Sequence, residues 1–177
     1  MKKYDNFCAA LTNMKEIYNY EEPYDTVVLT GLVGLYEICF EQSWKMMKEI
    51  LGVHGYEESA TGSPKTILKT AYQAGMIKDE ALWLRALQER NNVSHSYNKE
   101  IALEIVRQAK DDFYQMFCEL EREIDYAGYR IITEILWKEK ALEVTKIREI
   151  QAAQDSVYGG GTTEFIGRAM EAFYGKP

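Results

Sequence analysis

The sequence has few residues that interrupt or cross-link a chain. Proline and cysteine each occur only three times in 177 residues. Cys8, Cys39 and Cys118 are odd in number, lie far apart and form no Cys-x-x-Cys pair, so we expect neither a disulfide framework nor a zinc knuckle. Because His54 and His95 are the only histidines, we also expect no metal site.

Long uncharged runs are absent as well. The longest covers residues 26–36, too short to span a bilayer of about 30 Å. Asp5 and Asn6 follow the two N-terminal lysines, which is unlike a signal peptide, so we expect a cytoplasmic protein that does not contact a membrane. The glycine triplet at residues 159–161 has no strand before it and no Lys-Ser/Thr after it, so it is a linker and not a phosphate-binding loop. We therefore expect no cofactor.

Apolar residues spaced three and four apart predict helices along most of the chain, and strand-like alternation hardly occurs. Ser63 and Asp79 are expected to cap helices, and Gly75 to end one. We therefore predict an all-α protein in which residues 1–125 form an antiparallel bundle of four to five helices. The predicted helices cover residues 4–20, 25–51, 65–74, 80–91 and 98 to about 125.

Residues 126–177 differ from the bundle in charge. They contain seven Lys or Arg and seven Asp or Glu, so the net charge of −7 lies wholly in residues 1–125. Helices are predicted over 129–155 and 163–174, with the glycine break at 159–161 between them. The second domain is thus expected to be a helical C-terminal extension.

The helix predicted over 25–51 is apolar on two sides. Because a single bundle would leave part of that surface in water, we expect a homodimer built around this helix and the one that starts near residue 98. Glu37 and Glu41 could form a carboxylate pair on it, but an ion pair between Glu41 and Lys45 is favoured. The two stripes contain Leu32, Leu35, Cys39, Met46 and Ile50, and Val33, Tyr36, Phe40, Trp44 and Met47.

A polar segment at residues 89–98 separates two apolar helices. The plain explanation, favoured when the segment is taken alone, is a helix-helix corner, because Asn and Ser suit caps and turns. The chemical explanation is metal-free phosphoryl transfer, in which a histidine moves the proton of a ribose 2′-hydroxyl and an arginine stabilises the charge of the transition state.

The helical geometry limits this second explanation. On an uninterrupted helix Arg90 and Tyr97 would nearly eclipse one another, which would put the arginine charge beside the phenol, while His95 would lie about 140° from Arg90. Arg90 and His95 can then meet at one phosphate in two ways. Either the chain turns at residues 91–92, or two copies of the segment face each other across a two-fold axis.

Arg90, His95 and Tyr97 form the pattern Arg-x4-His-x-Tyr. This pattern resembles the signature of HEPN-domain proteins that are paired with minimal nucleotidyltransferases, the family called nucleotidyltransferase substrate-binding proteins. The resemblance covers about residues 3–125. Further motifs occur in the family's order, namely Tyr36-Glu37-x-x-Phe40-Glu41-x-x-Trp44-Lys45, Pro64 with Ala71-Tyr72-Gln73-Ala74-Gly75, and Trp83.

The resemblance implies a homodimeric helical bundle and a nucleotidyltransferase partner usually encoded next door. It implies an RNA-cleaving toxin in which Arg90 and His95 are catalytic, Asn91 and Ser94 position the substrate, and Tyr97 accepts nucleotides from the partner, which acts as antitoxin. The sequence departs from the family in two places. Asn98 stands where aspartate is frequent, and residues after 125 lie outside the family pattern.

Three functions therefore remain open: a metal-independent endoribonuclease toxin, a non-catalytic substrate-binding subunit of a two-component nucleotidyltransferase, and a plain dimeric bundle with a relic motif. The complete Arg-His-Tyr set favours the first. The acidic balance favours the other two, because domains that bind RNA are normally basic. Any site for RNA or a nucleotide is thus expected to be local, near Arg85, Arg90 and Lys99.

Overall fold

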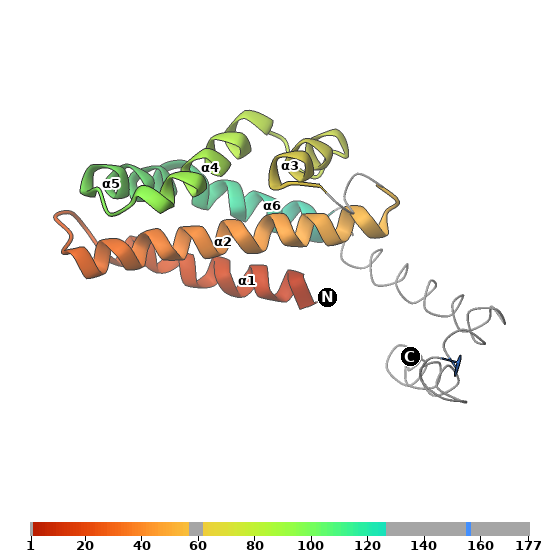
Figure 1. Ribbon diagram of the computed structural model, residues 1–177, viewed down its shortest axis with the longest axis horizontal. Coiled ribbons are helices and arrows are strands. Elements are labelled where there is room, and N and C mark those ends of the chain that lie inside the picture. The colour runs from red at the N-terminus through yellow and green to blue at the C-terminus, as the bar shows by residue number, and fades with distance from the viewer. Residues whose placement is uncertain (1, 57–61, 127–154, 157–177) are drawn as a thin grey trace. The chain divides into compact units, whose positions relative to one another are not determined.

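The computed structural model describes residues 2–56, 62–126 and 155–156, and all regular structure in these ranges is helical (Figure 1). The predicted all-α class is confirmed. The chain divides into two compact units, Met1–Arg130 and Ile131–Pro177. The glycine break at 159–161 and the predicted helices over 129–155 and 163–174 lie outside the described residues, except for 155–156. No helix in the described ranges is long and apolar enough to cross a membrane.

The first unit is a bundle in which the long helix α2 runs antiparallel to α1 (Figure 1). Helix α1 packs against α2 and α6, and α2 also contacts α3, α4 and α5. The last three segments follow one another without a loop and form one rod, as the spacing predicted. The elements are α1 (Lys2–Met14), η1 (Lys15–Asn19), α2 (Thr26–Val53), α3 (Pro64–Gln73), α4 (Glu80–Asn92), η3 (Val93–His95), α5 (Lys99–Gln108), η4 (Ala109–Phe113) and α6 (Tyr114–Tyr126).

Local signals set the ends of α3 and α4. Ser63 Oγ accepts a hydrogen bond from the Thr66 N–H at 3.3 Å, and Asp79 Oδ1 accepts one from the Leu82 N–H at 2.9 Å. Each cap satisfies a backbone donor that the first helical turn leaves unpaired. Gly75 follows α3 with a φ of 74°, a conformation that other residues rarely adopt. All three predicted boundary signals are confirmed.

The core is centred on aromatic side chains from α2, α4, η4 and α6. The ring of Tyr36 stacks on Phe113 with centroids 5.3 Å apart, and Trp83 meets Phe117 edge to face at 5.5 Å. The Tyr36 hydroxyl donates a hydrogen bond to the carbonyl of Ala86 in α4. Burial raises the pKa of Tyr36, which keeps this hydroxyl protonated and able to donate.

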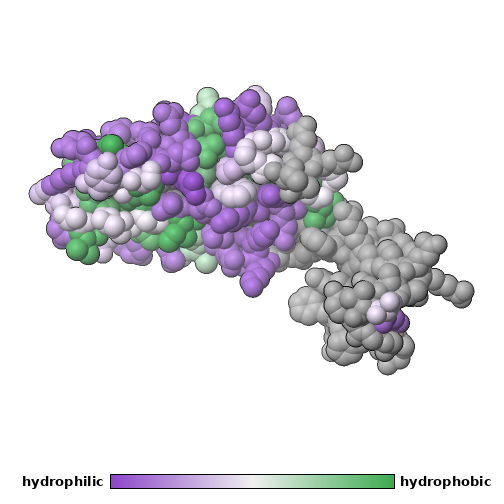
Figure 2. Space-filling model, viewed as in Figure 1, coloured by the Kyte–Doolittle hydropathy of each residue, from purple (hydrophilic) through white to green (hydrophobic). Residues whose placement is uncertain are grey.

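Both apolar stripes of α2 are buried within the one chain. Eight of their ten residues are buried, and Leu35 and Trp44 are partly buried. The expectation that a single bundle leaves part of these stripes in water therefore holds only at Leu35 and Trp44, because α1, α3, α4 and α5 pack against the rest of α2. Other side chains of α2 remain in water instead, with Val27 82% and Ile38 54% exposed. Figure 2 shows hydrophobic patches on the bundle face that carries α2.

The rod from α5 to α6 contains a π-helical turn, η4, that its regular apolar spacing does not reveal. The carbonyl of Lys110 in this turn accepts a hydrogen bond from the Tyr18 hydroxyl at 2.6 Å. The Lys110 ammonium group donates to the Tyr20 carbonyl at 2.5 Å and to the Tyr24 hydroxyl at 2.9 Å. These bonds hold the connection between α1 and α2 against the middle of the rod. The predicted stripe is buried throughout, at Ala102, Val106, Ala109, Phe113, Met116, Leu120 and Ile124.

The bond between Tyr36 and Ala86 leads to a prediction about stability. Tyr36→Phe removes the hydroxyl without changing the packing of the ring, and we expect it to lower the free energy of unfolding by about 1 kcal/mol. Tyr72→Phe is the matched control, because Tyr72 is 45% exposed. Urea denaturation followed by circular dichroism measures both variants. Equal midpoints for the two variants would show that the buried bond contributes nothing.

Candidate functional site

The polar segment forms the corner between α4 and α5, as its plain explanation predicted. Helix α4 ends at Asn92, a 3-10 turn covers Val93–His95, and α5 starts after Asn98. Asn98 Oδ1 accepts hydrogen bonds from the N–H groups of Glu100 and Ile101, at 2.9 and 3.4 Å. Asn and Asp cap helices about equally well, so the asparagine at this position performs the capping role that an aspartate would perform.

The break after Asn92 corrects the helical geometry that the sequence suggested. Arg90 and Tyr97 do not share one helix, so they are not eclipsed. The expectation that the guanidinium lies beside the Tyr97 phenol is therefore wrong. The chain does not turn at residues 91–92, which still belong to α4. It leaves the helix after Asn92, in the 3-10 turn Val93–His95 and the residues up to Asn98. Ser94 supports the turn, since its Oγ donates a hydrogen bond to the Asn91 carbonyl at 3.1 Å.

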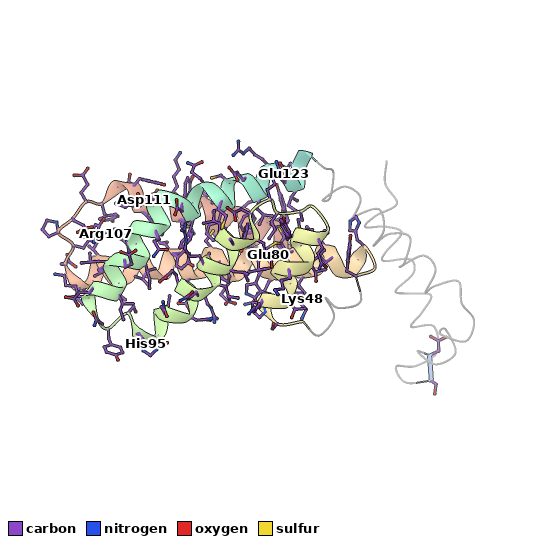
Figure 3. All side chains as sticks on the ribbon, turned by 90° about the horizontal axis from the view of Figure 1, so that it is seen from above. Lys48, Glu80, His95, Arg107, Asp111 and Glu123 are labelled. Atoms are coloured by element: carbon purple, nitrogen blue, oxygen red, sulfur yellow. The ribbon has the colours of Figure 1, made fainter. Side chains whose placement is uncertain are left out.

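His95 and Tyr97 lie on the outside of this corner. The two rings meet edge to face, with centroids 6.3 Å apart and planes at 72°. Tyr97 is 87% exposed, and His95 lies at the outer edge of the bundle in Figure 3. Neither side chain forms a hydrogen bond or an ion pair within the part of the chain that the structure describes. The fold therefore leaves the polar atoms of both side chains available to a ligand.

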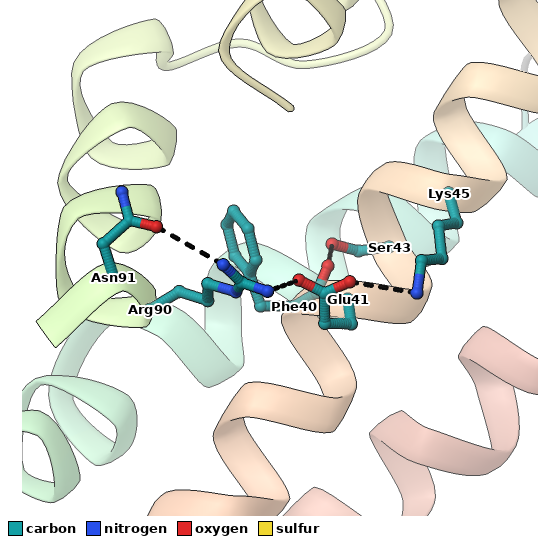
Figure 4. Close-up of polar contacts among 6 residues, drawn as sticks. All are labelled: Phe40, Glu41, Ser43, Lys45, Arg90 and Asn91. Carbon is teal, nitrogen blue, oxygen red and sulfur yellow. Dashed lines mark hydrogen bonds and ion pairs between the residues drawn. The ribbon is translucent and has the colours of Figure 1, made fainter. Parts of the chain in front are cut away.

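Arg90 is directed toward α2 instead (Figure 4). Its Nη2 pairs with Glu41 Oε1 at 2.5 Å, and Glu41 Oε2 pairs with Lys45 Nζ at 3.0 Å. Arg90 Nη1 lies 3.4 Å from Asn91 Oδ1, and its Nε is buried without a hydrogen-bond partner among the described residues. The predicted pair between Glu41 and Lys45 is confirmed, but the sequence did not predict the contact with Arg90. One signal for this contact was available. Glu41 follows Phe40, which is buried, and a carboxylate near the core needs a nearby cation.

The environment of Glu41 favours its charged form. Burial by itself would raise the pKa of this carboxyl group. The hydrogen bond from Lys45 and the positive charges of Arg90 and Lys45 outweigh burial, so the pKa of Glu41 lies below its ordinary value. The contact between Arg90 and Glu41 is therefore an ion pair at neutral pH.

No hydrogen bond or ring contact joins Arg90 to His95 in the described ranges. The structure brings Arg90 together with Asn91 and His95 together with Tyr97, as two separate groups on one corner. Of the three cations expected near an RNA site, Arg85 pairs with Asp112 and Arg90 with Glu41. The local positive charge is therefore smaller than the sequence suggested. Residues 2–56, 62–126 and 155–156 contain no group of three or more His, Cys, Asp or Glu that could hold a metal ion.

An antiparallel helical bundle with Arg-x4-His-x-Tyr at one exposed corner defines a HEPN-type protein. The family described as nucleotidyltransferase substrate binding protein like matches residues 2–125, and the chain belongs to this family. The resemblance drawn from the motifs is thereby confirmed.

Two individual proteins are also similar to this chain. A probable ribonuclease HepT from Haemophilus influenzae is 34% identical over 91 residues, which cover 50% of this chain and 61% of that protein. A crystal structure of a protein from Thermus thermophilus superimposes with a TM-score of 0.55 at 25% identity. That match covers 70% of this chain and 98% of the other. The second similarity supports the fold over the matched share of the chain.

Proposed function

We propose that this protein is a metal-independent endoribonuclease toxin of the HEPN type and the partner of a minimal nucleotidyltransferase. The observation that carries the proposal is the unused state of His95 and Tyr97. A helix corner needs caps and turn residues, which Asn98 and Ser94 supply. Capping and turn formation do not require an imidazole and a phenol on the same corner, and neither is hydrogen-bonded to any described residue. A role in a reaction explains their presence. The similarity to a probable ribonuclease and the family membership support this reaction class.

The reaction uses the groups of the corner without a metal. His95 takes the proton of a ribose 2′-hydroxyl, and the oxygen attacks the adjacent phosphorus. The bond from phosphorus to the 5′-oxygen breaks, and that oxygen takes up a proton, which leaves a 2′,3′-cyclic phosphate and a 5′-hydroxyl. Arg90 stabilises the negative charge that develops on the phosphoryl oxygens, and Asn91 and Ser94 position the phosphate. Such a toxin would act on RNA in the cytoplasm.

Cleavage of RNA tests this mechanism. His95→Ala and Arg90→Ala should each abolish cleavage and relieve growth inhibition, and EDTA should have no effect. The melting temperature of His95→Ala should stay close to that of the wild type, because the imidazole is exposed. His54→Ala serves as the control, because it removes the only other histidine. Cleavage that requires Mg²⁺, or that survives His95→Ala, would contradict the mechanism.

A second function is favoured by the charges of the site. The family description names substrate binding, the chain carries a net charge of −7, and Arg85 and Arg90 are already ion-paired. These features suit a non-catalytic subunit that binds the substrate of a nucleotidyltransferase. Wild-type protein that binds the transferase tightly but cleaves no RNA would establish this function in place of the first.

We also propose that the protein is a homodimer, in which the groups of two corners combine into one site. Its support on α2 is a line of four residues, the α2 face, in which Val27, Gly31 and Ile38 are exposed and Gly34 is partly exposed. A Cβ atom added at Gly31 or Gly34 would meet nothing within 4 Å, so the fold of one chain does not require glycine there. Glycine inside a helix lowers the stability by about 1 kcal/mol relative to alanine. The close approach of a helix from a second copy explains why glycine occurs at these two positions despite that cost.

The dimer can be tested in solution. Light scattering at micromolar concentration should give twice the chain mass of 20.5 kDa. Ile38→Glu places a charge in the α2 face and should shift the protein to monomer, because an unpaired charge at an interface is strongly disfavoured. Tyr72→Glu makes a similar change at an exposed position on α3 and should leave the dimer intact. Wild type that is monomeric under these conditions would end the proposal.

Tyr97 is proposed as the site at which the partner attaches nucleotides. Its exposure gives a transferase access to the hydroxyl, and its ring contact places any attached phosphate beside His95. The added charge and bulk would compete with RNA for the site, so modification would inhibit cleavage directly.

Mass spectrometry after co-expression with the neighbouring transferase tests this role. The intact mass of the wild type should rise by one or more nucleotide units, and Tyr97→Phe should prevent the rise. Tyr72→Phe is the control, because it removes another exposed phenol and should leave the modification unchanged. A rise that persists in Tyr97→Phe, or none in the wild type, would exclude Tyr97 as the acceptor.

A further inference from the structure

Three charged side chains meet between α2 and α4, next to the corner (Figure 4). The Glu41 carboxylate lies between the two cations and contacts Arg90 with one oxygen and Lys45 with the other. Glu41 is the least exposed of the three at 18%, compared with 34% for Arg90 and 45% for Lys45. The carboxylate is therefore the fixed member, and the cations are arranged around it.

The ion pair limits the directions in which the Arg90 guanidinium can point. A free arginine side chain has many rotamers, and ordering it for a ligand costs conformational entropy. Glu41 holds Nη2, while Nη1 keeps only its 3.4 Å contact with Asn91 Oδ1 among the described residues. The backbone of the same segment is also fixed from α2, because Tyr36 bonds the carbonyl of Ala86, one turn before Arg90. Helix α2 thus fixes Arg90 twice, at the backbone through Tyr36 and at the guanidinium through Glu41.

Lys45 changes the charge that a ligand meets. Glu41 and Arg90 alone would be neutral and would offer little attraction to a phosphate. With Lys45 the group has two cations and one anion, so it keeps a net charge of +1. This local charge stands against a chain with a net charge of −7. The arrangement therefore orders the arginine without removing the positive charge from the site.

We propose that Glu41 is a positioning residue that aims the Arg90 guanidinium at the substrate phosphate, and that Lys45 keeps the site cationic. The inference rests on the proposed function in one respect, that the phosphate belongs to an RNA phosphodiester. Glu41 itself does not touch the reacting atoms. Its effect on the reaction passes through Arg90.

The proposal separates the effects of the two residues on kinetics. Glu41→Ala frees the guanidinium and raises the net charge of the group to +2, so kcat for RNA cleavage should fall about tenfold or more while KM stays the same or falls. Lys45→Gln leaves a neutral pair, so KM should rise about two- to fivefold at low salt with kcat nearly unchanged. Glu41→Gln keeps an acceptor for Nη2 and should restore part of the lost kcat. Glu37→Gln is the matched control on the same helix and should match the wild type.

A second measurement does not depend on cleavage. Nuclear magnetic resonance of ¹⁵N-labelled protein should show slow rotation of the Arg90 guanidinium in wild type and Glu37→Gln, and fast rotation in Glu41→Ala. Binding of a non-cleavable 2′-O-methyl oligonucleotide should be weaker for Lys45→Gln and equal or tighter for Glu41→Ala. These results without any cleavage by the wild type would contradict the ribonuclease but support the positioning role. Unchanged kcat in Glu41→Ala, guanidinium rotation as fast in the wild type as in that variant, or no oligonucleotide binding by the wild type would each overturn it.

Discussion

The contact between α2 and α4 determines where the polar corner of this protein lies. It has a buried part, in which the Tyr36 hydroxyl bonds the Ala86 carbonyl, and a partly exposed part, in which Glu41 pairs with Arg90. The aromatic core around Tyr36 fixes the position of α2, and α2 then fixes the last two turns of α4. The 3-10 turn and the start of α5 follow from that fixed end. A site at the surface is in this way held by the centre of the core.

Local features of the fold could be predicted from the sequence, because their causes lie within a few residues. Ser63, Asp79 and Gly75 each act on the adjacent turn, and the apolar spacing gives the buried side of each helix. The two apolar stripes of α2 indicate cover on two sides, but which helices supply it could not be predicted, because α1, α3, α4 and α5 come from separate parts of the sequence. The π-helical turn was missed for a related reason, since the bond that accompanies it comes from Tyr18, on a distant part of the chain.

The candidate site shows the same division between local and distant causes. The motif located Arg90, His95 and Tyr97, and Asn98 gave a cap that explains the turn between them. The direction of the Arg90 side chain depends on Glu41, on another helix, and no spacing rule connects the two. The charge balance has a similar origin, because Arg85 and Arg90 find their carboxylates on other helices. An acidic chain can therefore still hold one ordered arginine at this corner.

The π-helical turn also constrains the length of the chain. Each residue of an α-helix advances the side chains by about 100° around the axis. One residue fewer in Ala109–Phe113 would turn α6 by that angle relative to α5 and would carry Met116, Leu120 and Ile124 away from the core they now fill. An insertion or deletion within this rod would therefore change which side chains of α6 face the core.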